Sequence, residues 1–203
     1  MIGDLRSALI APQGWIGRWS PGIGDPTLLG WLTVAAYVGA AWLCLRARRV
    51  ALVEQAAGER RGAVTFWGLG ALALGALGLN KQLDLQTALT ELGRIIAHEQ
   101  GWYEHRRFVQ LGVVILVGLA TVVACGSVCR LARGDLRRLW LAIFGAAELG
   151  AFVIIRATSI HKVDKLIGAD FLGVRVNGWL ELGGISCIAF AAWRYRLRDQ
   201  QLH

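Results

Sequence analysis

The sequence has few charged residues and almost no lysine. Only 18% of its 203 residues are Asp, Glu, Lys or Arg, against roughly 25% in soluble domains. Lysine occurs only at positions 81, 162 and 165, so nearly all of the 22 basic residues are arginine. Hydrophobic residues make up 55% of the chain, and the mean hydropathy is +0.48. This composition excludes a disordered chain, argues against a soluble domain and predicts a small polytopic membrane protein.

Three further signals are missing. The first 27 residues have no basic start followed by a long apolar stretch, so we do not expect them to act as a secretory signal peptide. The four cysteines all fall in apolar runs, so no extracytoplasmic disulfide framework is implied. No compact metal motif such as H-E-x-x-H is present. The first 27 residues do contain Trp15, Ile16 and Trp19, which are typical of a segment at the membrane–water interface.

Five apolar runs predict about five transmembrane helices. A bilayer core about 30 Å thick needs about 20 helical residues, and only helices or closed barrels pair all backbone groups in lipid. The fifth run is the weakest because it is short and contains Glu181. The runs are 28–45, 63–79, 108–129, 139–155 and 178–193. The predicted fold is an all-α integral membrane protein with a single transmembrane domain, 1–203.

Arginine is concentrated in alternate connecting segments. The dense segments are 46–62, 130–138 and 194–203, and the sparser, longer ones are 1–27, 80–107 and 156–177. The positive-inside rule therefore places the N-terminus outside and the C-terminus in the cytoplasm, with the chain multi-pass in the inner (plasma) membrane. This threading accounts for the net charge of +8. The sequence thus predicts the lipid bilayer, and no nucleic acid, as a partner.

The two long outer loops, 80–107 and 156–177, contain three of the four histidines. Within the first, apolar residues recur at helical spacing across 83–98, which predicts an amphipathic helix on the membrane surface. Polar residues seven apart form a stripe on its other side, and carboxylates and imidazoles so placed can bind a metal or pass protons. The alternative is an ordinary solvent-facing stripe. The stripe consists of Asp84, Glu91, His98 and, beyond Gly101, His105.

The second loop places Ser159, His161 and Asp164 just after the fourth run. On a helix, His161 and Asp164 could reach one ion or substrate, which makes both of them metal candidates and catalytic candidates. Ser159 is a candidate nucleophile only if the turn is not helical. Arg156 could bind a phosphate or carboxylate, or could simply be a helix-end arginine that reaches the interface.

The second run ends in a similar polar turn, which adds Asn80, Lys81 and Asp84 to Arg156 as candidate binding residues. The shared pattern hints at a duplicated hairpin.

Two acids lie within the apolar runs. Glu148 is near the middle of the fourth run, and Glu181 is near the outer end of the fifth. A charge there costs several kcal/mol, about 2.5–3.5 on insertion scales, so each acid must face the bundle, be paired or be protonated. Arg156 and His161 are the expected partners of Glu181, itself a catalytic candidate.

The sequence leaves three functions open. The first is a non-catalytic subunit or assembly factor of a membrane complex, which explains the small size and the faces of small residues such as Ala71 and Gly75, or Ala146 and Gly150. The alternative is an integral membrane enzyme with an outward-facing polar site, with or without a metal ion, that acts on a lipid or lipid-linked substrate. A haem or quinone redox protein ranks lower, because the outer histidines lie in loops. No cofactor is identified.

The threading predicts where reporter domains fused to truncated chains will be found. Fusions after residues 55 and 134 should report a cytoplasmic location, and those after 95 and 165 an external one, because the arginine-rich segments are retained inside. Paired reporters, one active only inside and one only outside, measure this. A cytoplasmic signal at 95 would overturn the predicted orientation.

Overall fold

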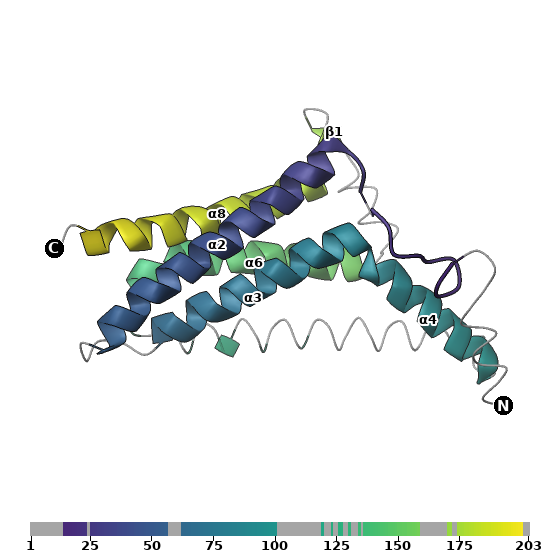
Figure 1. The fold of residues 1–203 in the computed structure, drawn as a ribbon, viewed down its shortest axis with the longest axis horizontal. Coiled ribbons are helices and arrows are strands. Elements are labelled where there is room, and N and C mark those ends of the chain that lie inside the picture. The colour runs from purple at the N-terminus through teal and green to yellow at the C-terminus, as the bar shows by residue number, and fades with distance from the viewer. Residues whose placement is uncertain are drawn as a thin grey trace. The chain divides into compact units, whose positions relative to one another are not determined.

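The computed structural model describes residues 14–23, 25–56, 62–100, 136–158 and 174–200, and the isolated positions 119, 123, 126, 127, 130, 134, 170 and 171. Residues 14–23 and 25–27 form turns, bends and an isolated β-bridge between Ile16 and Trp19, and nearly all the other described residues are helical apart from one pair of two-residue strands (Figure 1). The elements are α2 (Leu28–Ala56), α3 (Gly62–Leu83), α4 (Leu85–Glu99), α6 (Leu136–Thr158), β1 (Asp170–Phe171), β2 (Val174–Arg175) and α8 (Val176–Gln200). The strands pair antiparallel, Asp170 with Arg175 and Phe171 with Val174. The predicted helical fold is confirmed, and only this short ladder was not expected.

Three of the described helices are long and apolar enough to cross a membrane: α2, α3 and the Leu136–Ile155 part of α6. They contain the first, second and fourth predicted runs. The third run lies mostly outside the described residues. Helix α8 has 25 residues, about 37 Å at 1.5 Å per residue, but it contains Glu181 and several arginines. That the fifth run spans the membrane therefore stays a prediction.

The helices extend beyond the apolar runs. The predicted loop 46–62 is helical as far as Ala56, and the predicted tail 194–203 is helical as far as Gln200. Hydropathy marks only the residues that suit lipid, whereas Ala, Leu, Arg and Glu are all good helix formers in water. The helical hydrogen-bond ladder therefore continues through the arginines, and the connections are shorter than the hydropathy pattern indicates.

The chain divides into two compact units, which we describe separately. The first contains residues 1–34 and 77–113, and the second contains 35–76 and 114–203. In the first unit Thr27 caps α2, since its Oγ1 accepts a hydrogen bond from the Gly30 N–H at 3.0 Å. The predicted amphipathic helix 83–98 is confirmed as α4.

The core of the second unit is built on an aromatic group and on small residues. Trp67 of α3 is fully buried, with its ring centroid 5.0 Å from that of Phe66 and 5.5 Å from that of Tyr195 of α8. Cys44 of α2 is also fully buried. It is a free thiol that packs as a small apolar side chain.

Helices α6 and α8 approach each other closely at Gly145 and Gly184. A Cβ on Gly145 would lie 2.7 Å from the Gly184 carbonyl oxygen, and one on Gly184 would lie 2.9 Å from the Gly145 oxygen. Only glycine permits this approach. The sequence pattern pointed to the neighbouring Ala146 and Gly150 instead, and a Cβ on Gly75 would meet no heavy atom within 4 Å.

Replacing Gly145 by alanine should lower the stability of the purified protein in detergent, by about 1–3 kcal/mol as for other overpacked cores. The matched control is Gly39→Ala in α2, where an added Cβ meets nothing within 4 Å. The control should be neutral or slightly stabilising, since alanine favours a helix by about 0.5–1 kcal/mol over glycine. Thermal unfolding of both variants measures the difference. Equal transition temperatures would contradict the close α6–α8 contact.

Candidate functional site

Glu54 joins three helices at the arginine-rich end of the second unit. Its Oε2 accepts a hydrogen bond from the Tyr195 hydroxyl of α8 at 2.5 Å. Its Oε1 accepts one from Arg138 Nη1 of α6 at 3.3 Å, which is also an ion pair. Both charged side chains are mostly shielded, with 30% of Arg138 and 20% of Glu54 exposed. The carboxylate on α2 therefore ties the end of α2 to α6 and α8.

Glu181 is a second buried acid, only 3% exposed. The Tyr37 hydroxyl of α2 donates a hydrogen bond to Glu181 Oε1 at 3.1 Å, and Tyr37 is itself 1% exposed. The contact links α2 to α8 inside the apolar bundle. The expected partners Arg156 and His161 are not tested, because the Arg156 side chain and the whole of His161 lie outside the described part of the chain.

Glu148 differs from these two acids. It lies on α6, where the Cβ that Gly183 of α8 lacks would be 3.4 Å from Glu148 Oε1. Its Oε2 atom is buried and has no hydrogen-bond partner in the part of the chain that is described. A glycine thus makes room for a carboxyl group whose hydrogen-bonding capacity is not satisfied there.

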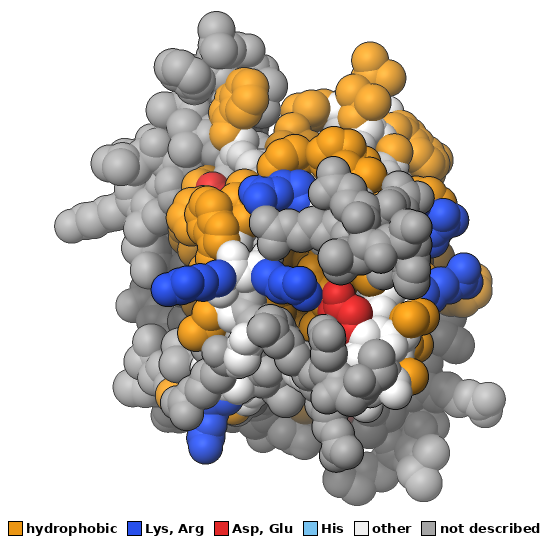
Figure 2. Space-filling model, turned by 90° about the vertical axis from the view of Figure 1, so that its left-hand side faces the viewer, with side chains coloured by type: hydrophobic (Ala, Val, Ile, Leu, Met, Phe, Trp, Pro, Cys, Tyr) orange, Lys and Arg blue, Asp and Glu red, His pale blue; other side chains and the backbone are white. Residues whose placement is uncertain are grey.

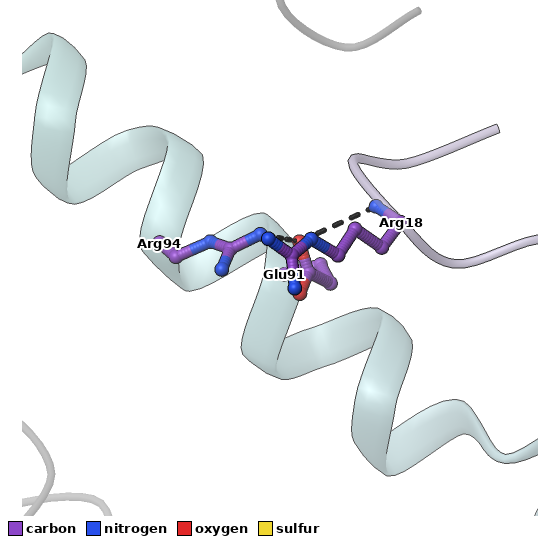
Figure 3. Close-up of polar contacts among 3 residues, drawn as sticks. All are labelled: Arg18, Glu91 and Arg94. Carbon is purple, nitrogen blue, oxygen red and sulfur yellow. Dashed lines mark hydrogen bonds and ion pairs between the residues drawn. The ribbon is translucent and has the colours of Figure 1, made fainter. Parts of the chain in front are cut away.

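In the first unit, Glu91 is 9% exposed and binds two arginines (Figure 3). Its Oε2 accepts a hydrogen bond from the backbone N–H of Arg18 at 3.3 Å, and it forms an ion pair with Arg94 one turn along α4. Gly17, with a positive φ of 57°, turns the chain next to this carboxylate, and any Cβ there would be 2.5 Å from Glu91 Oε2. The Glu91 carboxylate thus holds the turn around residue 17 against α4.

Asp84 separates α3 from α4. Its backbone is left-handed, with φ 46° and ψ 48°, a conformation that Asp tolerates better than most residues. Its Oδ2 accepts a hydrogen bond from the Thr87 hydroxyl at 2.6 Å. Asn80 and Lys81 precede it in the last turn of α3, and both are half-buried. The structure thus brings these three candidate binding residues together at one bend.

The other predicted site residues are less closely grouped. His98 is exposed near the end of α4, two turns beyond Glu91. Among the described residues, no three His, Cys, Asp or Glu side chains are close enough to hold a metal ion. Cys125 and Cys129 of the third apolar run lie outside the described residues. His105, Ser159, His161 and Asp164 do as well, so the predicted metal and catalytic sites stay predictions.

Sequence reasoning missed Glu54, Arg138, Tyr195 and Tyr37. The first three fall in the arginine-rich segments, which were interpreted only as a signal for the orientation of the chain. The signal for Tyr37 was indirect: a buried Glu181 requires a donor, and a tyrosine hydroxyl within a run can supply one. No protein-family model, curated protein or solved structure matches this chain. The functional argument therefore depends on the residues themselves.

Replacing Tyr195 by phenylalanine should lower the free energy of unfolding by about 1–2 kcal/mol, because a shielded hydrogen bond to a carboxylate is lost. In a Glu54→Gln background the same replacement should cost clearly less, because the charge that strengthens the bond is already gone. Chemical or thermal unfolding of the two single variants and the double variant forms the double-mutant cycle. Strictly additive effects would show that the Tyr195–Glu54 contact contributes nothing to stability.

Proposed function

We propose that the protein is a non-catalytic subunit or assembly factor of a membrane complex in the inner (plasma) membrane, with its C-terminus in the cytoplasm. The observation that carries this proposal is the unsatisfied carboxyl group of Glu148. Glu54, Glu91 and Glu181 each have a donor within the chain. Among the described acids in membrane-spanning helices, Glu148 has a buried carboxylate oxygen, Oε2, that accepts no hydrogen bond.

An unsatisfied acid in a span is expensive, about 2.5–3.5 kcal/mol when charged. Glu148 lies near the middle of α6 and is half-buried as a residue, but its Oε2 atom is buried. A donor from a neighbouring membrane helix would recover this cost where it meets the carboxyl group from the accessible side, and interhelical hydrogen bonds of this kind hold membrane helices together. The partner would therefore be a spanning helix with a hydroxyl, amide or basic side chain at matching depth.

The face of α6 next to Glu148 has the pattern of a helix-packing seam. Phe144, Ala147 and Ala151 are all exposed and are spaced i, i+3 and i+7 along α6. This is the spacing of the seam between two packed helices. The two alanines flank Glu148 and are small enough for another backbone to approach the carboxyl group closely. Glycines meanwhile hold the contact with α8.

The alternative, an outward-facing membrane enzyme, depends on Ser159, His161 and Asp164. All three lie outside the described residues, and no described contact favours it over the subunit hypothesis.

Purification in a mild detergent after crosslinking in cells tests the proposal. The wild-type chain should retain a specific membrane-protein partner, and Ala151→Leu and Glu148→Leu should lose most of it, because one blocks the approach and the other removes the acceptor. Glu148→Gln should retain it in part, since an amide still forms hydrogen bonds. The matched control is Ala73→Leu, which enlarges an exposed alanine on α3 in the same way.

The subunit hypothesis would be contradicted if the wild-type protein ran as a solitary, monodisperse species with no crosslinked partner. Equal loss of the partner with Ala73→Leu would show that α6 is not the docking face.

A further inference from the structure

A recess opens at the arginine-rich end of the second unit, between the end of α2, the first turns of α6 and the end of α8. Its volume is about 30 Å³, enough for one or two water molecules or the oxygens of a small polar group. Three arginines and one acid line it together with apolar side chains. The lining residues are Glu54, Arg137, Arg138, Trp140, Leu141, Ala191, Arg194 and Tyr195.

The recess has an excess of positive charge. Glu54 is the acid that lines it, and this carboxylate already binds Arg138 and Tyr195. Arg137 and Arg194 have no ion pair or hydrogen bond among the described residues, which leaves two cationic groups at the recess without an acid. Figure 2, which views this end of the helices, shows Lys and Arg side chains distributed around an acidic one.

The basic side chains at the recess give it a preference for an anion. A phosphate would be attracted by the guanidinium groups of Arg137 and Arg194.

The recess also has an apolar side. Leu141 and Ala191 line it, and Trp140, which is 57% exposed, lies where a spanning segment begins. Tryptophan at such a position is typical of the lipid headgroup level. A free phosphate makes no use of an apolar wall, whereas a phospholipid presents its phosphate and its glycerol backbone together. The combination favours a lipid.

We propose that an anionic phospholipid binds at this recess. Oxygens of its phosphodiester group enter the recess beside Arg137 and Arg194, and the glycerol and first acyl carbons lie outside it along Trp140 and Leu141. Arg138 stays paired with Glu54 and forms the floor of the site. The proposal concerns a lipid site and does not depend on the protein partner proposed for α6.

Native mass spectrometry of the full-length protein in detergent tests the site, with phosphatidylglycerol and phosphatidylcholine of matched acyl chains as probes. The wild-type protein should bind phosphatidylglycerol at least tenfold more tightly than phosphatidylcholine. The double variant Arg137→Gln with Arg194→Gln should bind phosphatidylglycerol about 25-fold more weakly, from about fivefold for each arginine near an anionic lipid. These residues are outside the Glu54 cluster, so the fold should be retained.

The matched control is Arg49→Gln with Arg130→Gln, which removes the same charge from two exposed arginines that do not line the recess. It should change the affinity by less than about threefold. Equal weakening in both double variants would reduce the effect to diffuse surface charge and overturn the site. Competition by inorganic phosphate at millimolar concentration would assign the recess to a free anion and overturn the lipid. Equal affinity of the wild-type protein for the two lipids would overturn the proposal independently of any variant.

Discussion

A carboxylate among apolar helices must find a hydrogen-bond donor, and the arrangement of the second unit depends on this requirement. Glu54 accepts from Arg138 and Tyr195, and Glu181 accepts from Tyr37. These contacts join α2 to α6 and α8 near the arginine-rich end and again within the bundle. Because hydrophobic attraction between helices is weak in lipid, a few directional bonds of this kind decide which helix faces meet.

Helix α6 combines two surfaces with different uses. On one, Gly145 packs against Gly184 of α8 so closely that no side chain fits between them. On the other, Trp140, Phe144 and neighbouring alanines are exposed next to an acid whose buried oxygen has no partner in the described chain. The first surface is packed within the fold. The second surface is exposed, and we propose that it binds a protein partner and that the basic recess at its start binds an anionic lipid.

Much of the fold could be predicted from hydropathy, and little of the candidate site. The runs at 28–45, 63–79 and 139–155 marked three long helices, because length and apolarity are local properties. The helical period of 83–98 marked α4 for the same reason. Local patterns could not show that Glu91 would be buried beneath Gly17, since that contact joins residues 74 positions apart, nor that Tyr37 would meet Glu181.

The sequence by itself determined that the chain is helical and suited to a membrane, and that its positive charge is concentrated as arginine in alternate segments. Those conclusions depend on composition and period, which need no knowledge of neighbours. Only the tertiary structure decided which acids are satisfied. It paired Glu54, Glu91 and Glu181 with donors from distant segments or adjacent turns and left Glu148 Oε2 without one. The physical reason is that a hydrogen bond depends on the positions of two groups to within a few tenths of an ångström, and helix packing alone sets those positions.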